Sequence, residues 1–475
     1  MDDAQQLKEQ LLELGRRYAR QRHADRRSGG PAQFVPGVTP VPYAGRVFDE
    51  TEVAAALGSV LDFWLTLGPE GDAFATELAA VLGVRTSLPV NSGSSANLLA
   101  VSALTSHKLP KERRLLPGDE VITCAAGFPT TVAPILQAGA VPVFIDNDPL
   151  TGNADCAQLA AALRPGKTKA VMLAHALGNP FDLGAVTAFC RAHGLWLIED
   201  NCDALGSTYA AEDGVAVPTG RWGDLSTQSF YPPHHITLGE GGAVNVVREM
   251  RFKSIVESFR DWGRDCWCAS GQDNTCGKRF GWQLGELPEG YDHKYVYSHL
   301  GYNLKPLDIQ AAIGRCQLRR LPEFGQLRRR NWQALRRGLA EFAEHFEFML
   351  PTHATAWSEA GFSWDATGRR SDPSWFGFML RVRPEAPFRH VDLARFLDER
   401  KIGSRMLFGG NLVRQPVFTQ LRRERPEAFR VVGPLSGADR LMEQALFLGV
   451  YPGLSAAMLD YMVQSVADFV RRRVS

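Results

Sequence analysis

The sequence lacks any uninterrupted apolar run near the roughly 18–20 residues that cross a bilayer, so we expect no membrane-spanning helix. It also lacks an excess of either charge, because 53 basic residues stand against 52 acidic ones. A nearly neutral chain has no overall field with which to hold nucleic acid or an anionic membrane. Residues 1–27 carry charges throughout and contain no apolar core, which argues against a signal peptide. We therefore expect a cytoplasmic protein.

Cysteine is scarce as well. Eight cysteines in 475 residues are too few for a disulfide scaffold, and a cytoplasmic chain keeps its thiols reduced. Apolar residues make up 45% and charged residues 22%, a balance typical of globular proteins, and the length fits two or three domains. Half of the cysteines stand singly in apolar or helical contexts, as small buried side chains do, namely Cys124, Cys156, Cys190 and Cys316.

Short apolar strands alternate with helices in the first half of the chain. The expected strands are 86–90, 120–125, 141–145, 170–174 and 195–198. The expected helices between and beside them are 95–104, 131–137, 156–163 and 184–192. This alternation favours an α/β fold with a mainly parallel central sheet that is covered on both faces.

The flanking regions follow other patterns. An amphipathic helix is expected over 7–20, followed by an extended arm rich in proline and glycine over 26–45. Residues 251–302 show no regular period, and an irregular stretch of that length inside a compact domain is usually functional. Helices are expected again over 308–321 and 328–342. A smaller α+β region follows, with a strand over 375–382 and helices over 391–401 and 456–472.

Three motifs carry the chemistry. The small residues of 91–97 stand between a strand and a helix, where free backbone N–H groups can bind an anion, although many such segments are simple turns. Asp200 ends an apolar strand, at the edge where open α/β sheets bind ligands, or it could equally cap a helix. The third motif runs from Ser229-Phe230 through His234-His235 to the glycine-rich segment 239–242.

In this order the motifs resemble those of the sugar aminotransferase family, which uses pyridoxal phosphate and has the aspartate-aminotransferase fold (fold type I). In that family a lysine stands five residues after the serine of the Ser-Phe pair. Here that position is His234, and no lysine occurs between Lys169 and Lys253, so the exchange is no slip of register. The exchange resembles the branch of 3-dehydrases that act on nucleotide-linked 4-keto-6-deoxy sugars from pyridoxamine phosphate. The resemblance implies that His234 moves the proton in catalysis.

The resemblance also implies the cofactor contacts. Asp200 would pair with the pyridine nitrogen, and Phe128 would stack on the ring. The phosphate would be held by Ser94, Ser95 and Ser229, and by Asn303 from the neighbouring subunit of a homodimer. Asp203 stands where many relatives carry a glutamine near the ring hydroxyl. We therefore expect an N-terminal helix and arm (1–45), a large cofactor-binding domain (46–335) and a small C-terminal domain (336–475).

Four cysteines remain. Cys266, Cys268 and Cys276 lie in an irregular loop at 262–300, and Cys202 follows Asp200 by two residues. Spacing alone leaves open a zinc site, an iron–sulfur cluster or no metal at all. The resemblance to the dehydrases of 3,6-dideoxyhexose synthesis implies that these four cysteines hold a 2Fe–2S cluster.

The function implied by the resemblance is loss of the C3 hydroxyl from a nucleotide-linked 4-keto-6-deoxyhexose, as in the deoxysugar synthesis that serves lipopolysaccharide. An NADH-dependent iron–sulfur flavoprotein reductase would be the partner that supplies electrons. The alternatives are a sugar aminotransferase, which the missing lysine opposes, a catalytically silent homologue, and a cluster-free dehydratase, which the cysteine-rich loop opposes. The sequence leaves the nucleotide open among CDP, TDP and GDP.

Overall fold

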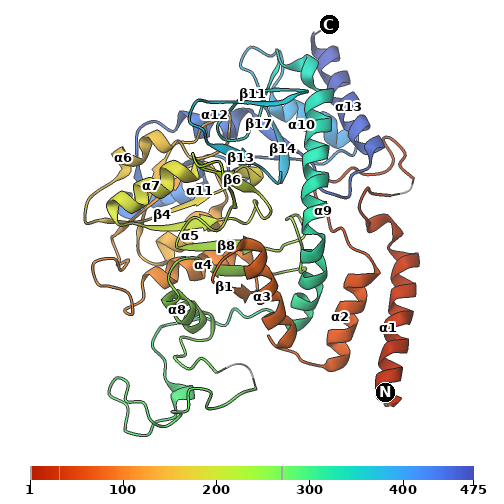
Figure 1. The fold of residues 1–475 in the computed structure, drawn as a ribbon. Coiled ribbons are helices and arrows are strands. Elements are labelled where there is room, and N and C mark those ends of the chain that lie inside the picture. Colours follow the sequence, from red (N-terminus) through yellow and green to blue (C-terminus); the bar gives the residue numbers. More distant parts are fainter. Residues whose placement is uncertain (1–2, 32, 269–270, 475) are drawn as a thin grey trace.

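An eight-stranded sheet forms the centre of the computed structural model, which describes residues 3–31, 33–268 and 271–474 (Figure 1). The strand order is β1-β9-β8-β5-β4-β2-β3-β16, and β9 alone runs antiparallel to its neighbours. The strands are β1 (Thr86–Val90), β2 (Glu120–Cys124), β3 (Val141–Ile145), β4 (Thr168–Ala174), β5 (Trp196–Asp200), β8 (Leu225–Ser229), β9 (Gly242–Val246) and β16 (Arg430–Val431). The expected mainly parallel sheet is confirmed.

Helices cover both faces of this sheet because successive side chains of a buried strand point to opposite sides. Met172 and Ile198 pack with one layer of helices, α4 (Gly93–Leu104) and α8 (Arg251–Arg260). Val171 and Leu197 pack with the opposite layer, α6 (Leu159–Ala162) and α7 (Leu183–His193). The helix α5 (Pro129–Gln137) adds Ile135 to the first layer. The strands β2, β5, β8 and β9 are therefore buried along their whole length, although β8 carries mostly polar side chains.

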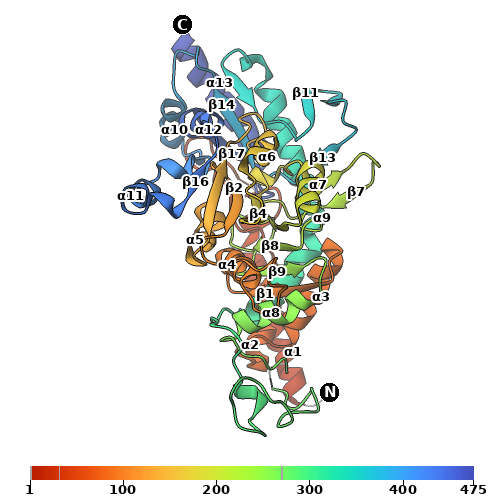
Figure 2. The same ribbon diagram turned by 90° about the vertical axis from the view of Figure 1, so that its left-hand side faces the viewer.

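A second, smaller sheet lies in the C-terminal part of the chain, in the upper region of Figures 1 and 2. Its four strands run antiparallel in the order β10-β14-β17-β15. They are β10 (Phe346–Phe348), β14 (Gly377–Val382), β15 (Ser404–Met406) and β17 (Ala445–Gly449), with helices α10 (His390–Glu399), α12 (Ser436–Gln444) and α13 (Ala456–Val474) around them. The boundaries at residues 45 and 335 stay a prediction.

Smaller elements complete the chain. Two minor sheets consist of β11 (Ala354–Ser358) with β12 (Gly361–Trp364), and of β6 (Thr208–Ala210) with β7 (Ala216–Pro218) and β13 (Arg370–Asp372). The helix α11 (Pro416–Glu424) lies before β16. Among the described helices, none is long and apolar enough to cross a membrane.

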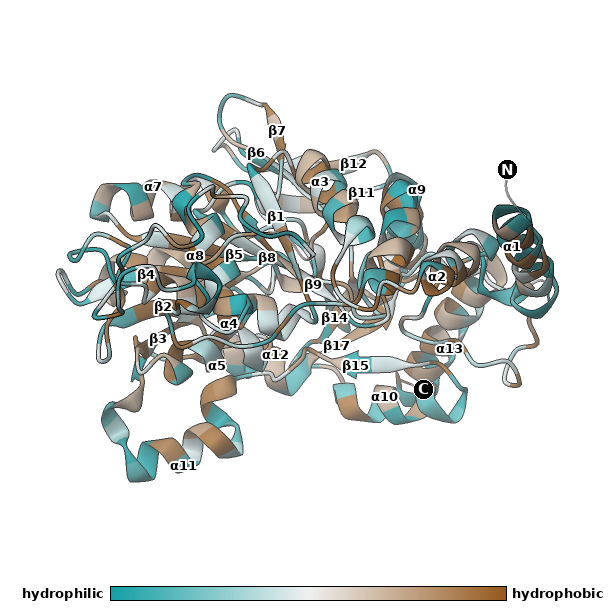
Figure 3. Cartoon of the chain, turned by 90° about the horizontal axis from the view of Figure 1, so that it is seen from below, coloured by the Kyte–Doolittle hydropathy of each residue, from teal (hydrophilic) through white to brown (hydrophobic). Residues whose placement is uncertain are grey.

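The N-terminal helix α1 (Asp3–Arg22) is the amphipathic helix that the sequence predicted. It packs against α2 (Glu50–Asp62) and lies at the edge of the molecule, where Figure 3 shows its alternating apolar and polar bands. The arm that follows runs back to the small sheet, where Val41 pairs with Ile402. Its next residues carry Tyr43 to the rim of the cavity described below.

Three predictions of local structure were wrong. The helices expected over 308–321 and 328–342 are one helix, α9 (Asp308–Gly338), which contains Pro322. Proline removes one backbone hydrogen bond, but the buried face continues through Leu321 and Phe324 and packs against α2 and α3 (Pro69–Leu82). The first ten residues of the expected irregular stretch form α8, whose apolar residues recur at helical spacing. The helix expected over 156–163 is a 3-10 turn followed by the one-turn α6.

Candidate functional site

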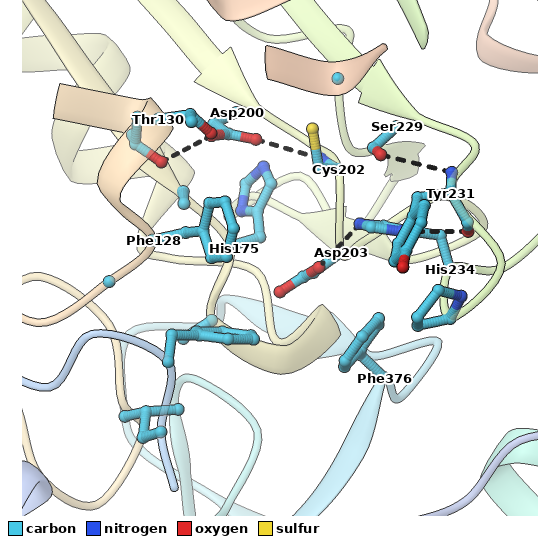
Figure 4. Close-up of a pocket in the computed structure, with 18 of the residues that line it drawn as sticks. Phe128, Thr130, His175, Asp200, Cys202, Asp203, Ser229, Tyr231, His234 and Phe376 are labelled. Carbon is cyan, nitrogen blue, oxygen red and sulfur yellow. Dashed lines mark hydrogen bonds and ion pairs between the residues drawn. The ribbon is translucent and has the colours of Figure 1, made fainter. Parts of the chain in front are cut away.

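A cavity of about 620 Å³ opens at the carboxyl ends of the parallel strands, next to the last residues of β5 and β8. Parallel strands bring the ends of several elements to one sheet edge, which is where α/β folds bind ligands. The cavity collects seven of the predicted site residues, namely Ser94, Phe128, Asp200, Cys202, Asp203, Ser229 and His234, most of which Figure 4 labels. None of the described residues that line it is a lysine.

Asp200 is held rigidly at the floor of the cavity. Its Oδ2 accepts hydrogen bonds from Asn97 Nδ2 at 2.8 Å and Thr131 Oγ1 at 2.7 Å. Its Oδ1 accepts only a longer bond, 3.3 Å, from the backbone N–H of Cys202. The carboxylate is therefore fixed by one oxygen and keeps acceptor capacity on the other. Sequence reasoning missed Asn97 and Thr131, although Asn97 closes the motif at 91–97.

The start of α4 forms an anion-binding edge beside β8. Ser92 caps the helix, since its Oγ accepts a hydrogen bond from the backbone N–H of Ser95 at 3.1 Å. A Cβ on Gly93 would lie 2.4 Å from the Cβ of Ser229, so only glycine lets the helix start this close to the strand. Ser94 and Ser229 line the cavity, whereas Ser95 does not. The contact predicted for Ser95 with a phosphate stays a prediction.

His234 projects into the cavity toward Asp203 (Figure 4). Its Nε2 lies 3.4 Å from Asp203 Oδ1, and its Nδ1 lies 3.3 Å from the carbonyl oxygen of Tyr231. The ring stands edge-on to Phe376, with 5.5 Å between centroids. Burial raises the pKa of Asp203, and the hydrogen bond with His234 opposes that rise. Asp203 therefore contacts the histidine, a role that the sequence did not indicate.

Arg328 supports this histidine from behind. Its side chain is 1% exposed, and its Nη2 and Nη1 donate to the carbonyl oxygens of His234 (3.0 Å) and Trp375 (3.1 Å). Burial lowers the pKa of Arg328 to about 9, while the charge of Asp203 acts in the opposite direction. No local sequence pattern indicates this role of Arg328, because it lies 94 residues from His234, on α9.

The neighbouring His235 has a different environment. It is 2% exposed and lies outside the cavity lining, with its Nε2 2.6 Å from the carbonyl oxygen of Ser374. A carbonyl only accepts, so this nitrogen carries the proton. Burial lowers the pKa of His235 well below its ordinary value, which keeps the ring neutral. Of the two adjacent histidines, His234 alone reaches the cavity.

Two aromatic rings complete the wall. Phe128 is half exposed and contacts Phe408 edge-to-face, with 6.0 Å between centroids. His175, which the sequence analysis missed, is fully buried and stacks on Phe181 at 4.3 Å. Its Nδ1 accepts from the backbone N–H of Phe181, so its Nε2 donates to Glu199 at 3.3 Å. This network fixes the ring beside the cavity.

The four cysteines predicted to bind a cluster lie in two places. Cys202 lines the cavity, whereas Cys266, Cys268 and Cys276 lie outside its lining, in the loop at 262–300. Within residues 3–31, 33–268 and 271–474, no group of three or more His, Cys, Asp or Glu side chains is arranged to hold a metal ion. One chain alone therefore does not form the predicted four-thiol site. Asn303 is likewise exposed and outside the lining, where it pairs with Asp261.

The loop thiols influence one another. Burial raises the pKa of Cys266, and the nearby thiols of Cys268 and Cys276 raise it further. The pKa of Cys268 lies below its ordinary value, because hydrogen bonds from Thr275 and Cys266 outweigh the effect of partial burial. Burial and the charge of Asp200 raise the pKa of Cys202.

The chain is similar in sequence to proteins of a known family. The profile of the DegT/DnrJ/EryC1/StrS aminotransferase family matches residues 47–467. The chain is 50% identical over 466 residues to lipopolysaccharide biosynthesis protein RfbH of Salmonella typhimurium, with 98% of each chain covered. It is 47% identical over 439 residues to dTDP-4-dehydro-2,6-dideoxy-D-glucose 3-dehydratase of Saccharopolyspora spinosa, with 92% of this chain and 88% of that one covered.

A solved structure shares the fold. The E. coli GDP-4-keto-6-deoxy-D-mannose-3-dehydratase with bound hydrated PLP aligns with a TM-score of 0.75 at 24% identity, covering 90% of this chain and 98% of that one. The expected aspartate-aminotransferase-like fold (fold type I) is thereby confirmed. Because the family's profile matches most of the chain and the fold agrees with it, the chain belongs to the DegT/DnrJ/EryC1/StrS aminotransferase family.

Proposed function

We propose that this protein is a nucleotide-sugar 3-dehydrase that removes the C3 hydroxyl of a nucleotide-linked 4-keto-6-deoxyhexose, using pyridoxamine phosphate, in 3,6-dideoxy sugar synthesis. One observation carries the proposal: His234 stands in the cavity at the position of the family's lysine, and none of the described lining residues is a lysine. A transaminase needs that amine as covalent anchor and proton carrier. The name of the Saccharopolyspora relative, a 3-dehydratase, supports the same reaction class.

The residues of the cavity fit this cofactor. The acceptor capacity left on Asp200 Oδ1 suits a protonated pyridine nitrogen, and the free N–H groups at the start of α4 suit a phosphate. Phe128 offers an exposed ring face, and the volume of about 620 Å³ lies in the range of small-molecule sites. When bound, pyridoxamine phosphate would supply the amine that joins the 4-keto group and the ring that takes up electrons.

His234 would carry the proton in this reaction, at the C4′ carbon of the cofactor. Both of its ring nitrogens face acceptors, the Asp203 carboxylate and the Tyr231 carbonyl. Such surroundings suit a ring that gains a proton during the reaction. Arg328 would hold the backbone of His234 in place, and Asp203 would orient the ring.

Replacing Asp203 by asparagine is expected to lower kcat about tenfold and to leave KM for the nucleotide sugar unchanged, because the change weakens only the orientation of the base. Steady-state kinetics with a saturating reductant measures both constants. An unchanged kcat would show that Asp203 does not position His234, and a raised KM with unchanged kcat would place Asp203 in substrate binding instead.

Arg405 stands at the rim of the cavity, with its guanidinium 4.2 Å from the ring centroid of Tyr43. It is the one arginine among the described lining residues. One guanidinium group can donate two parallel hydrogen bonds to phosphate oxygens. We place the diphosphate of the substrate here. The sequence resembles CDP-6-deoxy-L-threo-D-glycero-4-hexulose-3-dehydrase, so CDP is our first choice of nucleotide. Turnover with CDP-, dTDP- and GDP-linked 4-keto-6-deoxyhexoses tests that choice.

Loss of the C3 hydroxyl as water consumes no electrons, whereas reduction of the dehydrated sugar to the 3-deoxy product consumes two. The resemblance supports a 2Fe–2S cluster and an NADH-dependent iron–sulfur flavoprotein reductase as their source. We assign no step to a cluster on one chain, because the four thiols do not converge there. All eight cysteines are free thiols, consistent with the cytoplasm that we propose as its location.

A second candidate function is a cluster-free 3-dehydratase that regains its amine from glutamate, and the separation of Cys202 from the loop thiols favours it. An absorption spectrum of anaerobically purified protein, with iron and sulfide analysis, separates the two. We expect a cofactor band together with the visible bands of a cluster. Iron-free protein that turns over with glutamate would establish the second candidate.

A further inference from the structure

The arm between α1 and α2 is fastened beside the start of β15. The backbone N–H of Val41 donates to the carbonyl oxygen of Lys401 at 2.8 Å, and the N–H of Gly403 donates to the carbonyl oxygen of Val41 at 2.8 Å. With the pairing of Val41 and Ile402, these bonds form the pattern of a short parallel strand pair. In Figure 1 the arm continues from the upper end of α1 toward the small sheet. The register of the arm is therefore fixed just before Tyr43.

The backbone of Tyr43 then packs directly on β17. A Cβ on Gly449 would lie 2.3 Å from the carbonyl oxygen of Tyr43, so only glycine on this strand lets the arm come so close. The ring of Tyr43 stands edge-on to Phe447, with 6.0 Å between centroids. Both rings line the cavity. Contacts of its backbone and of its ring therefore place Tyr43 at the cavity.

Arg405, on β15, stacks on this ring and has no carboxylate partner. Its guanidinium carbon lies 4.2 Å from the ring centroid of Tyr43, and its Nη1 donates to the carbonyl oxygen of Ser404 at 2.8 Å. Among residues 3–31, 33–268 and 271–474, no acidic side chain forms an ion pair with Arg405, and the cavity carboxylate of Asp203 pairs with His234 instead. The guanidinium therefore keeps most of its N–H donors for a ligand.

Stacking on Tyr43 prepares Arg405 for an anion. An exposed arginine side chain has several freely rotating bonds, and it loses that freedom when it binds. A ring that already attracts the guanidinium to its face removes part of this cost before the ligand arrives. Only the ring is needed for this role, since the hydroxyl of Tyr43 forms no hydrogen bond with the part of the chain that the structure describes.

We propose that Tyr43 is a positioning residue for the substrate, because it holds Arg405 in the orientation that binds the diphosphate of the nucleotide-linked sugar. The N-terminal arm is then part of the substrate site. This inference rests on the proposed function, since it presumes a nucleotide-linked substrate. It also divides the cavity, with Asp200 and the start of α4 serving the cofactor and the pair of Tyr43 and Arg405 serving the substrate.

Calorimetric titration tests this role without turnover. Protein loaded with pyridoxamine phosphate is titrated with CDP, dTDP and GDP, and the diphosphate that binds most tightly is compared with its monophosphate. We expect Arg405→Ala to weaken binding of the diphosphate by about 10- to 100-fold, because hydrogen bonds to a charged group are lost. We expect Tyr43→Ala to weaken it by about three- to tenfold, the range of a cation–π contact. The preference for diphosphate over monophosphate should shrink in both variants.

The double variant Tyr43→Ala/Arg405→Ala separates positioning from direct contact. If Tyr43 acts through Arg405, the double variant binds the diphosphate no more weakly than Arg405→Ala alone. Additive losses would overturn the positioning role and make Tyr43 an independent contact. Tyr43→Phe keeps the ring and should bind like the wild type. A loss in Tyr43→Phe as large as in Tyr43→Ala would also overturn the proposal, because the hydroxyl would then be the group that acts.

Val38→Ala is the matched control on the arm, since this side chain is 63% exposed and lies outside the cavity lining. We expect it to bind like the wild type. In steady-state kinetics Tyr43→Ala should raise KM for the nucleotide sugar and leave kcat and the affinity for pyridoxamine phosphate unchanged. Wild-type affinity for the diphosphate in Tyr43→Ala would overturn this inference. A wild-type protein that binds none of the three diphosphates would instead contradict the proposed function.

Discussion

Replacing His234 by lysine is expected to lower the rate of C3 dehydration by about 10²- to 10⁴-fold, the range by which a positioned acid or base contributes. The variant would carry a lysine where other members of the family carry one. At this position the native His234 contacts Asp203 and Tyr231. We expect the variant to bind pyridoxal phosphate covalently, so that borohydride fixes the cofactor to the chain. Water loss from the sugar and the mass of the reduced protein measure the two effects.

His235→Asn is the matched control for that variant. The asparagine can still donate to the Ser374 carbonyl, and position 235 lies outside the cavity lining. We expect a dehydration rate within a few-fold of wild type, with some loss of thermal stability because a buried ring is removed. Parental dehydration by His234→Lys would show that His234 is not the base.

Replacing Asp200 by asparagine is expected to weaken cofactor binding by about 10- to 100-fold, since a hydrogen bond to a charged group contributes about 1.5–3 kcal/mol. Dehydration should fall further, because the ring loses the charge that keeps its nitrogen protonated. The side chain keeps its volume, and its amide can still accept from Asn97 or Thr131. Spectroscopic titration with pyridoxamine phosphate measures the affinity.

Asp224→Asn controls for loss of a buried carboxylate. Asp224 is 5% exposed and accepts a hydrogen bond from the backbone N–H of Leu197, away from the cavity lining. Burial raises the pKa of Asp224. We expect unchanged cofactor affinity. Equal losses for Asp200→Asn and Asp224→Asn would mean that the effect at Asp200 is one of folding.

Much of the central sheet could be predicted because its strands are buried on both faces. The bounds of β1 and β3 match the predicted ranges, since a short apolar run between turns has few other interpretations. The short strands β15 and β16 were not predicted. They contain three and two residues, which is too few to show a repeating pattern of side chains. The helix expected over 308–321 instead continues past Pro322, because α9 packs against helices that are distant in sequence.

Site residues that belong to a recognisable sequence motif could be predicted. Those that only the fold brings to the site, from distant parts of the chain, could not. Asp200 and His234 belong to motifs whose order along the chain is diagnostic. Arg328 and Asn97 act through partners that are 94 and 103 residues away, so no local pattern indicates them. The four cysteines could be selected from the sequence, but only the structure shows that Cys202 lines the cavity and that the three loop cysteines lie outside its lining.

The most direct test of the proposed function is a single turnover in ¹⁸O-labelled water without reductase. Protein loaded with pyridoxamine phosphate is mixed with the CDP-linked 4-keto-6-deoxyhexose, and the label at C3 is followed by mass spectrometry. We predict incorporation at C3 that requires the amine form of the cofactor and disappears in His234→Asn. Incorporation at the parental rate in His234→Asn, or none in the wild-type protein with any of the three nucleotides, would contradict it.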